Sequence, residues 1–192
     1  MKKILGIPIT LFVIALVVAG VGTAMLVKYL SNTVTHTVNV DSPLEMVGDT
    51  DLTLNIFGGE TIFYGVTTIN HADVNIDSYP VTEVTGPGVW EGTEFSEVTL
   101  TDPSGTYNVL SLGLLYIVKD DGTLIPFSNV GSLNTDTIKI YVDKTGTGTL
   151  TKYARGVGFE EQNNVTIITN TNIAPGIYTI KSCQLFDILG NC

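Results

Sequence analysis

Apolar and polar residues alternate in short runs along most of the chain after residue 24. In one such run, Leu52, Leu54 and Ile56 alternate with polar residues, and the glycine pair at 58–59 follows after Phe57. Alternation with a period of two is typical of a strand with one buried face, and paired glycines favour a tight turn. No segment of this part of the sequence keeps a helical period. The pattern therefore predicts strands joined by turns.

Together, the alternation and the turn residues predict roughly nine to eleven short strands. Besides residues 52–56, strands are expected at 34–40, 61–69, 74–79, 95–100, 107–118, 138–142, 147–155, 165–169 and 177–185. This organisation predicts an all-β fold: a single antiparallel β-sandwich, jelly-roll-like in type, preceded by an N-terminal apolar helix or signal segment.

Several local features sharpen this picture. The run from Tyr107 to Val118 is the most apolar of the sandwich part and is expected to be a central strand. Pro80 is expected to end the strand before it, because proline cannot donate a ladder hydrogen bond. Turn residues predict turns at 102–105 and 120–123, and the polar segment 160–164 is expected to be a solvated loop.

The first 24 residues have a different character. A pair of lysines precedes an apolar run from Ile4 to Val21, and the small residues Gly22 and Ala24 follow it. A charged start, an apolar centre and small residues at the −3 and −1 positions are the layout of a secretory signal peptide. Residues 1–24 are therefore expected to be a signal peptide, and the rest of the chain is expected to be extracellular or at the cell surface after export.

Two alternatives to a cleaved signal peptide remain open. The apolar run has roughly 18 residues, enough to cross a bilayer as an uncleaved membrane anchor. It also allows a type IV pilin-like leader cut near Gly6, although Pro8 lies inside the helix that such a filament core needs. With an anchor, the chain would be a cell-surface β-sandwich that serves binding or adhesion.

Residues 25–40 form the segment most informative about function. They are rich in β-branched and apolar residues, and Lys28 is their only charged residue. Exposed edge strands are usually protected by charge or proline, so a bare strand is expected to pair. It either closes the sheet of its own domain, residues 41–192, or inserts into the sheet of a neighbouring copy. The expected donor-strand residues are Met25, Val27, Tyr29, Val34, His36 and Val38.

Composition narrows the choice of partners. The chain has 9 basic and 19 acidic residues and a formal net charge of −10. Nucleic-acid binding requires a basic surface, so no nucleic-acid partner is expected. Contact with a membrane is expected only through the leader before cleavage, and the expected partner is a further copy of the chain, in a homopolymer formed by strand exchange.

Motifs for catalysis are absent from the sequence. Its two histidines, His36 and His71, belong to no His-Glu-x-x-His helix, and there is no Gly-x-Ser-x-Gly element. The acidic pairs at 49/51 and 120/121 offer oxygen ligands for a hard cation, but turn formation explains both. The chain is therefore expected not to be an enzyme and to need no metal or cofactor.

Four further residues are candidates for structural or modification roles. Cys183 and Cys192 can close a small disulfide loop in an oxidising compartment, or remain unpaired thiols. Asn164 begins the sequon Asn-Val-Thr and is a candidate N-glycosylation site. Trp90 is either an interface anchor or a loop side chain folded onto the edge of the sandwich.

Four segments carry a resemblance to a known family. They are the leader ending Val-Ala-Gly-Val-Gly-Thr-Ala24, the strand segment Asn32–Val40, the turn Gly58-Gly59-Glu60 leading into the strand Ile62–Asn70, and the closing segment Ala174–Tyr178. In these segments the chain resembles the TasA/camelysin-like biofilm-fibre proteins, in particular the archaeal bundling-pilus and thread subunits. The turn departs from the family pattern, which has Pro-Gly where this chain has Gly58-Gly59.

The resemblance covers the N-terminal third and the C-terminal end of the chain. It implies a jelly-roll subunit of an extracellular filament, a pilus or biofilm fibre, whose N-terminal donor strand completes the sheet of the next subunit. The metalloprotease activity described for camelysin-like members is not carried over, because this chain has no zinc ligand set.

Overall fold

A computed structural model describes residues 3–4, 7–8, 13–18, 41–144 and 153–192. The chain divides into two units, residues 1–41 and 42–192. In the first unit, β1 (Lys3–Ile4) pairs with β2 (Ile7–Pro8), and residues 13–18 are helical. Among the helices of the described ranges, none has the length and apolar character needed to cross a membrane.

The expected donor strand lies outside the described residues. This applies to Met25, Val27, Tyr29, Val34, His36 and Val38, and also to most of the strand expected at 147–155. The structure therefore describes the second unit apart from residues 145–152.

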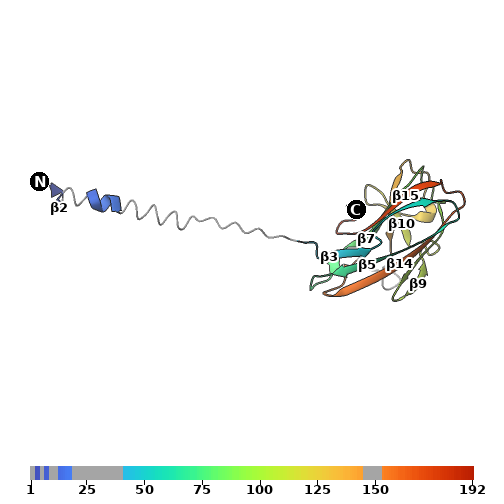
Figure 1. Cartoon of the computed structure of the whole chain (residues 1–192), viewed down its shortest axis with the longest axis horizontal. Helices are drawn as coiled ribbons and strands as arrows, with labels where there is room; N and C mark the ends of the chain where they lie inside the picture. The colour runs from blue at the N-terminus through green and yellow to red at the C-terminus, as the bar shows by residue number, and fades with distance from the viewer. Residues whose placement is uncertain (1–2, 5–6, 9–12, 19–40, 145–152) are drawn as a thin grey trace. The chain divides into compact units, whose positions relative to one another are not determined.

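The second unit consists of two antiparallel sheets packed face to face (Figure 1). The six-stranded sheet contains, in spatial order, β11 (Leu124–Pro126), β10 (Leu115–Val118), β12 (Thr137–Val142), β7 (Tyr79–Thr85), β15 (Gly176–Leu185) and β4 (Asp51–Ile56). The five-stranded sheet contains, in spatial order, β3 (Leu44–Gly48), β5 (Thr61–Asn70), β14 (Phe159–Thr169), β8 (Phe95–Asp102) and β9 (Gly105–Asn108).

The strand order confirms the jelly-roll type of sandwich. Four strands of one sheet, in the order β4-β15-β7-β12, face four of the other, in the order β5-β14-β8-β9. Along the chain, consecutive strands mostly alternate between the two sheets, which is the wrapping of a jelly roll. A short two-stranded sheet of β6 (Ile76–Asp77) and β13 (Tyr153–Ala154) and the 3₁₀ helix η1 (Phe127–Asn129) complete the unit.

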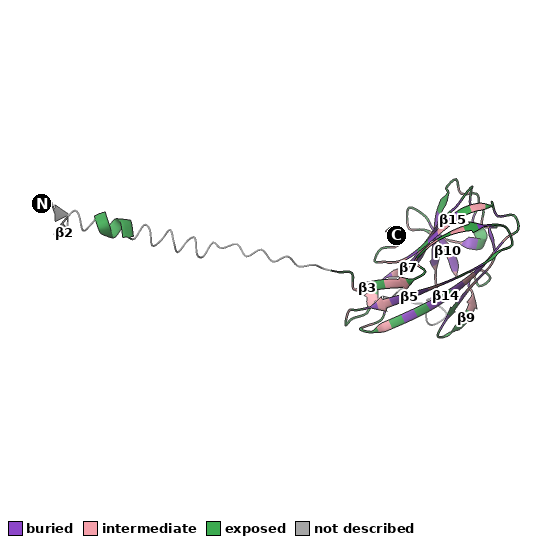
Figure 2. Cartoon of the chain, in the orientation of Figure 1, coloured by how far each residue is buried: buried purple, intermediate pink, exposed green. Residues whose placement is uncertain are grey.

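The core lies between the two sheets and follows from the two-residue alternation. On β5 and β14 nearly every second side chain is buried, and Figure 2 shows the resulting purple stripes along the strands. One end of the core is aromatic: Phe95 stacks on Phe127 with ring centroids 5.3 Å apart, and Trp90 packs against Phe95 and Tyr178. Trp90 is 3% exposed, so it is a loop side chain folded into the sandwich, not an exposed anchor.

The expectation of one central strand from Tyr107 to Val118 is wrong. The run is split between β9 in one sheet and β10 in the other. Between them the chain turns: the Asn108 side-chain oxygen accepts the Ser111 N–H at 2.9 Å, and Gly113 has a φ of +69°, which favours glycine. The run is apolar because its turn also packs inward, where Val109 is fully buried.

Two other local predictions are wrong. Pro80 does not end a strand but lies inside β7, where the ladder to β12 starts only at Val81, so its missing N–H does not interrupt that ladder. Residues 160–164 are not a loop but part of β14, with Glu161 and Asn163 facing the interior. Polar composition suggested a loop, yet these residues keep the same alternation as Val165 and Ile167.

The turn predictions are confirmed. The glycine pair at 58–59 joins β4 to β5, residues 103–104 join β8 to β9, and residues 119–123 join β10 to β11. In the last turn, the Asp121 carboxylate accepts the Thr123 N–H at 2.9 Å, an Asx turn. The strand expected at 177–185 is β15.

Candidate functional site

The two cysteines form a disulfide, which decides against unpaired thiols. Cys183 lies on β15, and its Cα is 5.6 Å from that of Cys192. The segment between them is held further by Lys139, whose ammonium donates to the carbonyls of Ile188 (3.3 Å) and Gly190 (2.5 Å). The Cys192 N–H donates to the Glu83 carboxylate at 2.9 Å. Residues 186–192 are thereby fastened to the six-stranded sheet.

One side of the sandwich presents open strand edges. β4 is the last strand of its sheet and pairs with β15 alone among the described strands. Its outward residues are polar, whereas Leu52 and Leu54 point inward and are only half-buried. An edge of this kind exposes backbone hydrogen-bonding groups and leaves apolar side chains incompletely covered, so it is suited to receive a further strand.

The facing sheet is open at the corresponding corner. β3 pairs with β5 only from Val66 to Asn70, and Asp49 extends the contact to Gly65, exchanging backbone and side-chain hydrogen bonds of 2.8 and 3.0 Å with it. In the described part of the chain, no strand pairs with residues 61–64 on this side. Phe63, in the middle of this stretch, is 72% exposed.

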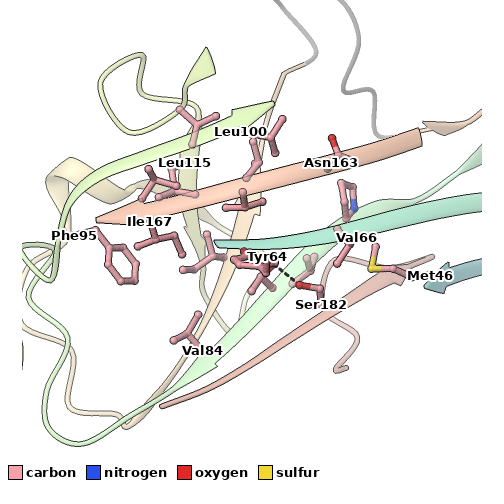
Figure 3. Close-up of a pocket in the computed structure, with 18 residues that line it drawn as sticks. Met46, Tyr64, Val66, Val84, Phe95, Leu100, Leu115, Asn163, Ile167 and Ser182 are labelled. Atoms are coloured by element: carbon pink, nitrogen blue, oxygen red, sulfur yellow. Dashed lines mark hydrogen bonds between the residues drawn. The ribbon is translucent and has the colours of Figure 1, made fainter. Parts of the chain in front are cut away.

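A cavity of about 70 Å³ lies between the two sheets (Figure 3). Its walls are mostly apolar, and a few polar side chains, among them Thr82, Asn163 and Ser182, reach into it. Thr82 and Ser182 hydrogen-bond each other at 3.1 Å. Burial raises the pKa of Tyr64, which also lines the cavity, to about 12, so the phenol stays neutral. The volume suits a few waters or a very small apolar molecule, not a larger ligand.

A cluster of ionisable groups is buried at one end of the sandwich. The Lys144 ammonium forms an ion pair with Oδ2 of Asp102, and the two side chains are 0% and 1% exposed. Oδ1 of Asp102 accepts the Ser104 N–H at 2.8 Å and the Ser104 hydroxyl at 2.5 Å. The Lys144 nitrogen lies 4.2 Å from the centroid of the Tyr107 ring.

Glu161 on β14 is the second acid of this cluster. Burial raises the pKa of Glu161 to about 7, against the opposing effect of Lys144 and Arg155. Burial also lowers the pKa of Lys144 to about 8, with the charge of Glu161 acting in the opposite direction. Near neutral pH, both groups are therefore much easier to neutralise than in water.

The remaining candidate residues occupy surface positions. Asn164 is exposed on the outer face of β14, and its use as a glycosylation site stays a prediction. His71 lies in a turn and contacts Glu45 at 2.9 Å. The carboxylates of Asp49 and Asp121 accept backbone N–H groups. Among the described residues, no group of three or more His, Cys, Asp or Glu is arranged to hold a metal.

Sequence reasoning missed the buried ionic cluster because its members are far apart along the chain. Lys144 and Asp102 are separated by 42 positions. One signal was present: Glu161 and Asn163 have the same parity as Val165 and Ile167, so continuing the β14 alternation backwards places both in the core.

Comparison with known proteins adds little to this geometry. No protein-family model and no curated protein matches the chain. A solved structure described as "AvmM Catalyzes Macrocyclization in Alchivemycin A Biosynthesis" is similar with a TM-score of 0.36 and 12% sequence identity, over 70% of this chain and 74% of that one. At this TM-score the similarity carries no argument about what this chain does.

Proposed function

We propose that this chain is the structural subunit of an extracellular filament, a pilus or biofilm fibre. In this proposal, residues 25–40 of one copy add a strand to the sandwich of the next copy. The contact is head-to-tail, and a head-to-tail contact that does not close into a ring produces a fibre. The proposal rests chiefly on the open edge of β4, with its half-buried leucines.

The chemistry of the donor segment suits this edge. A strand that pairs with β4 gains main-chain hydrogen bonds along Asp51–Ile56 and places alternate side chains beside Leu52 and Leu54. Residues 25–40 supply such side chains, and their single charge, Lys28, is opposite in sign to Asp51. The disulfide supports the extracellular part of the proposal, because such bonds persist in oxidising compartments.

Electron microscopy of the purified chain without residues 1–24 tests the proposal. Filaments are expected, and further deletion of residues 25–34 is expected to leave monomers. Filaments that survive this deletion would rule out donor-strand assembly by the segment. A chain isolated from its native membrane with residues 1–24 still attached would instead favour the anchored adhesion protein.

A matched pair of substitutions tests which edge receives the strand. Leu52→Lys places an inward-pointing charge on β4, and such charges are a natural means of blocking strand addition. Leu124→Lys makes the same change on β11, the opposite edge of the same sheet, where the leucine is also half-buried. Only Leu52→Lys is expected to abolish filaments, with circular dichroism showing that both variants fold. The reverse pattern, or loss in both, would contradict the assignment to β4.

A further inference from the structure

The Lys144–Asp102 pair lies where charged side chains are rarely found. Both side chains are essentially removed from solvent, between the end of β8 in one sheet and the segment after β12 in the other. Lys and Asp are almost never fully buried unless paired, and even a buried pair is often no more stabilising than apolar residues of similar size. Stabilisation of the fold by the ion pair is therefore a weak explanation for a lysine at this position.

The surroundings of Asp102 are those of a reactive carboxyl group. The Ser104 N–H and hydroxyl both donate to Oδ1, at 2.8 and 2.5 Å, while Oδ2 faces the Lys144 nitrogen. Two fixed donors on one oxygen stabilise negative charge that develops there when a nucleophile attacks the carbon, as in an oxyanion hole. The other oxygen is then the one that leaves.

The third requirement is a group that moves protons in a dry site. The register that pairs Asn164 with Thr101 brings Asn163 opposite Asp102, and Glu161 follows on the same inward face of β14. Glu161 is close enough to Lys144 for their charges to interact. With a pKa of about 7, its carboxyl exchanges protons readily near neutral pH.

We propose that Lys144 and Asp102 join in an intramolecular amide bond, formed by the folded chain itself with Glu161 as the proton relay. The uncharged Lys144 amine attacks the carboxyl carbon of protonated Asp102, so that the Nζ–Cγ bond forms and the Cγ–Oδ2 bond breaks. Glu161 takes a proton from the nitrogen and returns one to the departing oxygen. One water molecule is released, and the step needs no oxidant, metal or further reactant.

Burial removes the obstacle that prevents this reaction in water. There, the amine and the acid exist as ions, and an ammonium is no nucleophile. In the sandwich interior, burial lowers the pKa of Lys144, and transfer of its proton to Asp102 within the pair gives the uncharged amine and the protonated acid. The Tyr107 ring and neighbouring strands exclude water. The resulting bond would link the two sheets covalently, whether or not the chain forms filaments.

The mass of the purified, fully reduced and denatured full-length chain tests the proposal. It is expected to be lower than the mass of the sequence by one water molecule, and peptide fragmentation is expected to yield a branched peptide joining Lys144 to Asp102. A chain of full sequence mass after prolonged incubation at neutral pH would overturn the proposal and leave an ion pair.

Two variants separate this bond from other losses of water. Lys144→Arg keeps the positive charge and Glu161→Gln keeps the shape of the relay, and both are expected to retain the full mass. Water loss at an Asp-Gly sequence such as 121–122 gives the same mass change, but it would persist in Lys144→Arg and would then refute the proposal. Asp102 itself cannot cyclise in that way, because Pro103 has no N–H.

Discussion

Removing the disulfide should lower the stability of the sandwich by a predictable amount. Cys183 and Cys192 are separated by nine positions, and the loop-entropy relation gives about 2.5–3 kcal/mol at 25 °C for a loop of this size. Each kcal/mol shifts the melting temperature by about 2–4 °C in a domain of about 150 residues, so the expected loss is about 5–12 °C. The perturbation is the double variant Cys183→Ser/Cys192→Ser.

Local contacts indicate that the full loss of stability from the loop-entropy relation applies. The Lys139 ammonium and the Glu83 carboxylate hold residues 188–192 without the disulfide. These hydrogen bonds keep the segment in place in the folded state, so that the main effect of the substitution is a freer unfolded chain. The fold should therefore be preserved in the variant.

The assay is thermal unfolding of the oxidised chain and of the double variant, each with and without reductant. Reductant should lower the melting temperature of the parent chain towards that of the variant and leave the variant unchanged. Equal melting temperatures for oxidised parent and variant would refute the entropic reasoning. So would a reductant effect of the same size in both proteins.

Two further predictions address the core and the buried acid. Phe127→Ala removes a fully buried ring that stacks on Phe95 and should lower the free energy of unfolding by about 3–5 kcal/mol. Phe63→Ala removes an exposed ring and should change it by less than about 0.5 kcal/mol. Urea unfolding of both variants checks this, and similar losses of stability in the two would contradict the assigned core. Burial raises the pKa of Glu161 from 4.5 to about 7, so the folded chain binds the proton of this carboxyl more tightly than the unfolded chain does. The stability that protonated Glu161 contributes is therefore fully present below about pH 4.5 and is lost as pH rises through about 7. In Glu161→Gln, the urea midpoint should no longer fall as pH rises from about 5 to about 8. If the midpoint falls with pH in the variant as steeply as in the parent chain, another group titrates.

Two cationic side chains of the described residues oppose the effect of burial on the pKa of Glu161. Lys144 and Arg155 both lower the pKa of Glu161, but desolvation outweighs them. In the chain without an amide bond at Lys144, burial lowers the pKa of this amine, so its contribution to stability is lost as pH falls from about 10.5 through about 8. The two effects therefore fall in different pH ranges, and the interval between about pH 5 and pH 7 reports chiefly on Glu161.

The amino-acid sequence by itself determined the strands β4, β5, β8, β12, β15 and the second half of β14, several turns and the class of the fold. A two-residue period predicts a strand with one buried face wherever the strand pairs, and turn residues such as the glycines at 58–59 act through their own backbone freedom. These are local properties, so they are readable before the partners of each strand are known. A disulfide between Cys183 and Cys192 could be predicted as one of two alternatives because only nine positions separate the two cysteines.

Only the tertiary structure decided which residues meet. The break between β9 and β10 arises because the two strands belong to different sheets, and local apolarity does not record a change of sheet. Asp102, Lys144 and Glu161 come together through the arrangement of β8, β12 and β14. Leu52 lies at an open edge because β4 is the last of the described strands in its sheet. Contacts between distant residues depend on the closure of long loops and on the packing of whole sheets, which no short stretch of sequence specifies.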